Sequence, residues 1–155
     1  MIKGLFETHL NVTNLERSAE FYEHVLGLPL AYTENAVGRK LRFYWIGQER
    51  NQAMLGLWEK APPEVKRQHF AFQVSLEDLK HSVNDLQVKG VTPTNFFDDG
   101  KDQLYVFGWM PAVSVYFSDP DGHSLELLAV LPDSPKPELG MVPWNEWELM
   151  HGRTW

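Results

Sequence analysis

The sequence predicts an α+β fold in which two βαβββ modules pair and form a curved mixed sheet around a cavity. Each half of the chain begins with an alternating, half-buried strand pattern, followed by an amphipathic helix and further strands. Thr13 and Ser75, each followed three residues later by an acidic residue as in a helix capping box, lie 62 residues apart. The glycines that end the two helical patterns, Gly27 and Gly90, lie 63 residues apart. This repetition indicates a duplicated module.

The elements of the two modules can be placed by their periodicity. In the first half, apolar residues alternate with polar ones up to Val12, and a helical spacing then runs to Gly27. In the second half, Pro120 and Gly122 mark a tight turn between the last two strands, because proline presets φ and glycine accepts positive φ. The sequence therefore predicts strands at 5–12, 29–33, 41–46, 53–58, 69–74, 114–117 and 124–130.

These elements predict a single domain over residues 1–131, with modules at about 4–60 and 66–130. Residues 132–155 are rich in proline and tryptophan and are expected to form an extension packed on the domain. The segment 92–110 is longer than its counterpart in the first half and carries five aromatic residues. Those rings either line a pocket or complete the core or a subunit interface.

The composition excludes several classes of function. A formal charge of −7, with 14 basic and 21 acidic residues and no basic stripe, argues against nucleic acid or an anionic membrane as partner. The absence of cysteine excludes disulfides, thiolate ligands and cysteine nucleophiles. No stretch resembles a membrane span or a signal peptide, so we expect a cytoplasmic protein.

Strand phase brings three metal-binding side chains to one face. Because side chains alternate across a strand, the apolar set of each strand faces its helix and the remaining set faces the other way. His9, His69 and Glu126 all belong to this second set. If the modules pair as the repeat indicates, the three side chains converge in the cavity.

Two imidazoles and one carboxylate suit a divalent ion such as Fe(II), Mn(II), Zn(II) or Ni(II), and three protein ligands leave positions open for substrate. The alternative without a metal is that each histidine is a surface or hydrogen-bonded residue and that Glu126 faces solvent. The shared strand phase favours the metal site. Tentative substrate contacts are Asn11, Tyr44, Met54, Trp58, Gln73 and Tyr116.

Four segments strongly resemble the vicinal oxygen chelate superfamily, which holds glyoxalase I, fosfomycin-resistance enzymes, extradiol dioxygenases and bleomycin-sequestering proteins. They are HLNVTNLERSAEFY (9–22), GLPL (27–30), HFAFQV (69–74) and FSDPDGHSLE (117–126), of which the last is the most specific. The resemblance covers about residues 4–130. It implies paired βαβββ modules, a divalent metal in the cavity with His9, His69 and Glu126 as ligands, a small-molecule substrate and a homodimer, with or without exchanged modules.

One position departs from the glyoxalase I pattern, in which the final strand of the first module also carries a carboxylate ligand. Aligning residues 53–57 with 123–127 places Gly56 opposite Glu126, so this ligand is absent, and Glu59 lies in the opposite strand phase. We expect Gly56 to leave room for substrate. The pattern therefore favours the ligand set of the fosfomycin-resistance enzymes and dioxygenases over true glyoxalase I.

The sequence leaves the reaction open among three enzyme classes and one binding function. A dioxygenase suits a site of two histidines and one carboxylate, but no acid–base histidine can be placed. A transferase acting on a phosphonate needs basic residues at the cavity, for which Lys40, Arg42 and Lys101 are candidates. An isomerase or epimerase is the third option. The alternative class is a metal-free drug-binding protein of the bleomycin-resistance type, against which the complete ligand set argues.

Overall fold

The computed structural model describes residues 1–47 and 52–153, which form two compact units. Unit 1 contains residues 1–68 together with the turn 119–123, and unit 2 contains the remaining described residues. Each unit holds one mixed sheet, of four and five strands respectively, so the predicted α+β class is confirmed. No helix in the described ranges is long and apolar enough to span a membrane.

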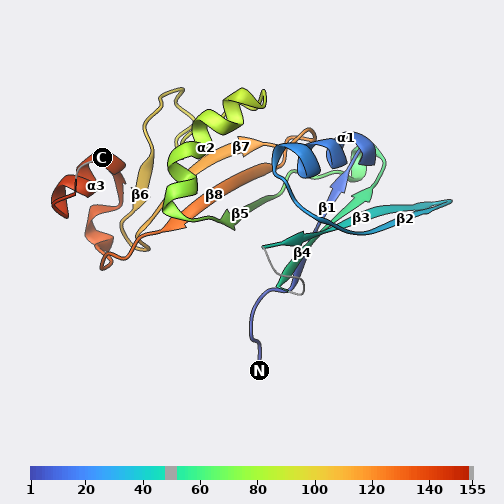
Figure 1. The fold of residues 1–155 in the computed structure, drawn as a ribbon, viewed down its shortest axis with the longest axis horizontal. Helices are drawn as coiled ribbons and strands as arrows, with labels where there is room; N and C mark the ends of the chain where they lie inside the picture. Colours follow the sequence, from blue (N-terminus) through green and yellow to red (C-terminus); the bar gives the residue numbers. More distant parts are fainter. Residues whose placement is uncertain (48–51, 154–155) are drawn as a thin grey trace. The chain divides into compact units, whose positions relative to one another are not determined.

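The sheet of unit 1 has the strand order β1-β4-β3-β2 (Figure 1). The parallel pair comprises β1 (Glu7–Val12) and β4 (Ala53–Glu59), whereas β3 (Arg39–Ile46) and β2 (Leu30–Ala36) run antiparallel. The apolar set of these strands is buried with residues of the following helix, and the core comprises Leu10, Val12, Leu15, Tyr22, Leu41, Tyr44, Leu55 and Leu57.

The helix of unit 1 differs from the prediction at its start, whereas Gly27, the predicted end, has the positive φ of a helix-ending glycine. The helix consists of α1 (Leu15–Glu20) followed by the π-helical segment η1 (Phe21–Val25). The residue that caps α1 is Asn14, whose side chain accepts a hydrogen bond from the Arg17 amide, so the predicted cap at Thr13 was wrong. Thr13 does not cap the helix, because its hydroxyl donates to Asp121 instead.

The sheet of unit 2 has the strand order β5-β8-β7-β6-β9. Ser75 caps α2 (Leu76–Val88) as predicted, and Gly90 has the positive φ of a helix-ending glycine. In Figure 1, α2 lies along β7 and β8. The strands are β5 (His69–Gln73), β8 (Ser124–Val130), β7 (Ala112–Ser118), β6 (Tyr105–Phe107) and β9 (Met141–Pro143).

The two shortest strands, β6 and β9, were not predicted from sequence. β6 lies in the aromatic segment 92–110, and β9 lies in the C-terminal region and pairs with β6. The region ends with α3 (Trp144–Met150), which packs on β6 and β9, and its Trp147 side chain is fully buried. The short 3-10 turns η2 (Pro62–Glu64) and η3 (Pro137–Leu139) complete the elements.

Candidate metal centre

The structure brings together two of the three predicted ligands, His69 and Glu126, in unit 2. β5 and β8 pair in parallel, with Ser124 beside His69 and Glu126 beside Ala71. Both side chains therefore lie on the face opposite the apolar set that contains Phe72. The Nε2 atom of His69 lies 3.3 Å from Oε2 of Glu126.

The hydrogen bonding of His69 determines which ring nitrogen is available. Its Nδ1 lies 3.1 Å from the backbone oxygen of Ser124. A carbonyl oxygen only accepts, so Nδ1 must carry the hydrogen, and in the neutral ring the lone pair is on Nε2. This lone pair faces a carboxylate oxygen, which is an unfavourable arrangement unless a cation or a proton lies between them.

Glu126 is a buried carboxylate with an unused oxygen. The residue is 4% exposed, and within the described chain its Oε1 has no hydrogen-bond partner. Burying a carboxylate oxygen without a partner is costly, and buried charges are normally paired or bound to a metal. The donor types, burial and geometry of His69 and Glu126 therefore fit two ligands of a divalent-metal site.

Tyr116 forms one side of this pair. It lies beside Glu126 in the β7–β8 register, and its ring stacks on His69 with centroids 5.9 Å apart. Burial raises the pKa of the Tyr116 hydroxyl to about 12, and the Glu126 carboxylate adds to the rise. The hydroxyl therefore stays protonated at neutral pH and can donate a hydrogen bond on this face of the sheet.

Four aromatic side chains of the segment 92–110 form a cluster that contacts Tyr116. Phe96 contacts Tyr116 edge-on and also packs against two further rings of the segment. The cluster is only partly buried, because Phe96 and Phe97 remain about half exposed. Its members are Phe96, Phe97, Tyr105 and Phe107.

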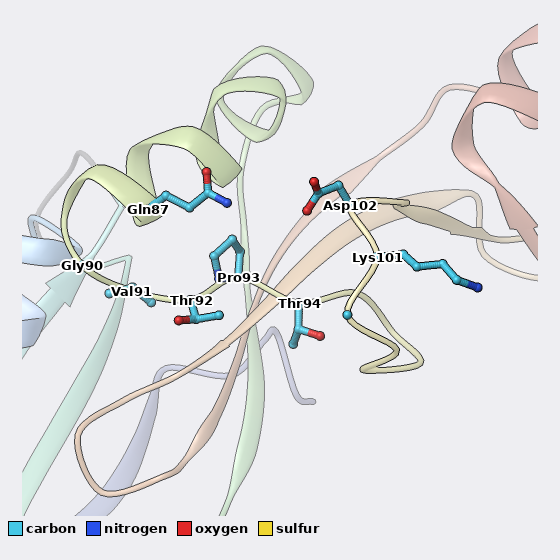
Figure 2. A pocket seen from close by; sticks show the side chains of 9 residues that line it. Gln87, Gly90, Val91, Thr92, Pro93, Thr94, Lys101 and Asp102 are labelled. Atoms are coloured by element: carbon cyan, nitrogen blue, oxygen red, sulfur yellow. The ribbon is translucent and has the colours of Figure 1, made fainter.

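An open pocket of about 420 Å³ lies in the same unit, between the end of α2 and the segment 92–102 (Figure 2). None of the aromatic residues of this segment lines it, and none of the predicted ligands does. The pocket is therefore separate from the His69–Glu126 pair.

His9, the third predicted ligand, lies in unit 1 and is held by aromatic side chains. The indole N–H of Trp58 donates to its Nδ1 at 3.0 Å, and the two rings stack. Phe43 on β3 meets the His9 ring edge-on across Gly56, which lies on β4 between them. A Cβ atom on Gly56 would lie 2.9 Å from Phe43 and 3.1 Å from His9, so the space beside Gly56 is filled by these rings and the expectation of room for substrate there was wrong.

The other tentative substrate residues have different surroundings. Asn11 donates to the backbone oxygen of Glu64, and Met54 neighbours Glu7 in the β1–β4 register. Gln73 is exposed at the end of β5. Tyr44 is fully buried in the core and donates its hydroxyl hydrogen to Glu23.

The three basic residues considered for a phosphonate are all paired with carboxylates. Lys40 contacts Glu59, Arg42 contacts Glu16 and Glu23, and Lys101 contacts Asp99. The charge of each is therefore offset by a nearby carboxylate.

Arg39 and Lys60 are the basic residues near His9 that sequence reasoning missed. The guanidinium of Arg39 and the ammonium of Lys60 lie 5.6 Å and 6.0 Å from the Trp58 ring centre. No carboxylate of the described residues lies within 4.0 Å of either group. Strand alternation, which puts Arg39 out of phase with Lys40, is the signal that could have found them.

The predicted ligands are thus divided between the units, one in unit 1 and two in unit 2. In the described parts of the chain, no three histidine or acidic side chains come together as a ready metal site.

Comparison with known proteins gives the class. Residues 4–127 match the model of the Glyoxalase/Bleomycin resistance protein/Dioxygenase superfamily, and the chain belongs to this superfamily. Among curated proteins it is similar to the glutathione transferase FosA of Serratia marcescens, with 32% identity over 130 residues that cover 82% of this chain and 81% of FosA.

Two solved structures illustrate the fold. The integron cassette protein HFX_CASS4, from the mobile metagenome of the Halifax Harbour sewage outfall, is 35% identical, with a TM-score of 0.68 over 83% of this chain and all of that one. The fosfomycin resistance protein FosX of Listeria monocytogenes, as an E126Q mutant complexed with Mn(II) and 1S,2S-dihydroxypropylphosphonic acid, has a TM-score of 0.64 at 22% identity, covering 85% of this chain and 95% of that one.

Proposed function

We propose that this protein is a metal-dependent enzyme of the fosfomycin-resistance type, which adds a thiol or water to a small anionic substrate. One divalent cation is held by His69 and Glu126 and by a side chain of β1, for which the sequence pattern favours His9. The cation supplies Lewis acidity that stabilises negative charge developing on substrate oxygens. The cytoplasmic location and the homodimer expected from the sequence are part of this proposal.

The observation that carries the proposal is the His69–Glu126 pair. Its imidazole lone pair faces a carboxylate oxygen at 3.3 Å, and the second oxygen of this buried carboxylate is unpartnered among the described residues. Ligand bonds of about 2.0–2.2 Å at tetrahedral or octahedral angles put neighbouring donors roughly 3 Å apart. The pair therefore has about the spacing of two ligands on one ion.

The charge near Trp58 supports an anionic substrate. Arg39 and Lys60 lack a carboxylate partner in the described chain and lie beside the ring that contacts His9. A phosphonate or carboxylate group would be attracted by these two cations. The similarity to the glutathione transferase FosA supports the addition of a thiol.

Metal analysis tests the proposal. The purified protein, reconstituted with Mn(II) or Zn(II), is expected to bind about one ion per chain. His69→Ala and Glu126→Gln each remove a ligand and should weaken binding by at least about 100-fold. His81→Ala, which removes an exposed histidine of α2, is the matched control and should bind as the wild type does.

Isothermal titration of the three variants provides the affinities. A wild-type protein that stays metal-free after reconstitution contradicts the proposal and leaves the metal-free drug-binding alternative, for which binding of a glycopeptide drug can then be measured directly.

A further inference from the structure

We propose that Glu7, in place of His9, is the ligand that β1 contributes to the metal centre. This inference rests on the proposed function and changes the chemistry of its site. It follows from the strand register of the two units, from the hydrogen bonding of His9 and from the contact between His9 and Glu7.

The register shows which residue of β1 corresponds to His69. In unit 2, His69 pairs with Ser124, and Glu126 follows two residues further along β8. In unit 1, Glu7 pairs with Met54, and Gly56 follows two residues further along β4. Within the repeat, Glu7 therefore occupies the position of His69, and Gly56 occupies that of Glu126.

His9 corresponds in the same way to Ala71. His9 pairs with Gly56 just as Ala71 pairs with Glu126. His9 and His69 look equivalent in the sequence because each lies in the strand before a helix. The pairing shows that, within the repeat, their positions differ by two residues. A shift of two residues keeps a side chain on the same face of the strand, so strand phase does not reveal it.

The hydrogen bonding of His9 also argues against a role as ligand. An indole N–H can only donate, so Nδ1 of His9 must be the acceptor for Trp58. In the neutral ring the hydrogen then lies on Nε2, and no lone pair remains for a metal. This is the opposite of His69, whose Nδ1 faces a carbonyl oxygen and whose Nε2 carries the lone pair.

Glu7 lies where the Nε2–H group of His9 can act on it. Its Oε1 is 3.6 Å from Nε2 of His9, and the two side chains share one face of β1. This contact is longer than a hydrogen bond, but at this distance the N–H dipole attracts the carboxylate, and outer-shell groups of this kind commonly orient a ligand. His9 is thus a positioning residue, fixed in turn by Trp58 and Phe43.

The ligand set becomes one imidazole and two carboxylates, from His69, Glu126 and Glu7. Oxygen donors favour Mn(II) over softer ions, and three protein ligands still leave positions open for two substrate oxygens. Among the metals that the sequence left open, the inference therefore favours Mn(II).

The experiment is a Mn(II) titration of the full chain, followed by electron paramagnetic resonance, with electron spin echo measurements of nitrogen coordination. The wild type is expected to show a single coordinated imidazole. Glu7→Gln keeps the shape but removes the charge, and should weaken Mn(II) binding by at least about 100-fold, whereas His9→Gln should weaken it less. Glu7→His, which copies His69, should retain the ion and add a second imidazole signal.

The outcomes separate the two proposals. Two coordinated imidazoles in the wild type, or Glu7→Gln binding as the wild type does while His9→Gln loses the ion, would overturn the role of Glu7 and leave the metal enzyme intact. A wild type that binds no Mn(II) or other divalent ion overturns both. Circular dichroism of the metal-free variants checks that each is folded.

Discussion

At the scale of single residues, the partner of an imidazole decides what the imidazole can do. His69 and His9 are the same residue type, and both lie on the polar face of a strand. His69 donates to a carbonyl oxygen and keeps a lone pair for a cation, whereas His9 accepts from an indole and keeps a hydrogen for a carboxylate. Neither difference is visible in strand phase.

Gly56 provides a prediction at the same scale. Gly56→Ala places a methyl group 2.9 Å from Phe43 and 3.1 Å from His9, so these rings must shift. Overpacking of this kind costs about 1–3 kcal/mol, and we expect urea unfolding to show a loss of that size. Gly4→Ala is the control, because a Cβ there meets nothing within 4 Å. Equal stability of both variants would show that the two rings adjust freely.

At the scale of elements, α3 is held by one ionic cluster. Arg153 contacts both Asp133 and Glu148, and the buried Trp147 donates its indole N–H to Asp133 at 2.7 Å. The hydrogen bonds from Arg153 hold the pKa of Asp133 at about 2, below its ordinary value of 3.8. The carboxylate therefore stays charged over the working pH range and anchors the C-terminal helix.

The depressed pKa of Asp133 sets the pH dependence of this anchor. Its contribution to stability is fully present above about pH 4 and is lost as the pH falls toward 2. Asp133→Ala leaves the Trp147 N–H unpaired and should cost about 1–3 kcal/mol at pH 7. The cost should shrink between pH 4 and pH 2, as measured by urea unfolding with Trp fluorescence. A cost that does not change with pH would contradict the ionic anchor, and Asp85→Ala on exposed α2 serves as control.

At the scale of the whole molecule, the chain enters unit 1 twice. Three side chains of the turn between β7 and β8 form hydrogen bonds within unit 1. Asp119 accepts from Tyr22, and Asp121 accepts from Thr13 and Arg17. His123 contacts the backbone oxygen of Asn11. The strands on either side of this turn belong to unit 2. Neither unit is therefore a continuous segment of the chain.

This connectivity predicts how the protein unfolds. Asp121→Ala removes the acceptor for Thr13 and Arg17, and should lower the free energy of unfolding by about 1–3 kcal/mol. The turn is covalently joined to β7 and β8, so unfolding of unit 1 should disturb these strands of unit 2. We therefore expect a single unfolding transition, in which the changes in Trp fluorescence and far-UV circular dichroism coincide. Two separated transitions, with only one shifted, would show that the units unfold independently.

Much of the fold could be predicted because it depends on local pattern. The alternation of residues 124–130 defined β8 with its observed bounds, and Ser75 was identified as a helix cap. β6 and β9 were missed because each has only three residues, too few for a pattern, and is defined by its pairing with other strands. The cap at Asn14 was missed because Asp121, 108 residues away from Thr13, binds the Thr13 hydroxyl.

The sequence by itself determined which side chains share a face, because alternation in a strand depends only on the residues of that strand. It therefore selected His9, His69 and Glu126 as candidate ligands, and the superfamily was confirmed by comparison. Only the tertiary structure decided the strand register, the buried and unpartnered oxygen of Glu126 and the partner of each imidazole. These depend on contacts between residues far apart in the chain, such as Trp58 with His9, and they lead to Glu7 as the proposed third ligand.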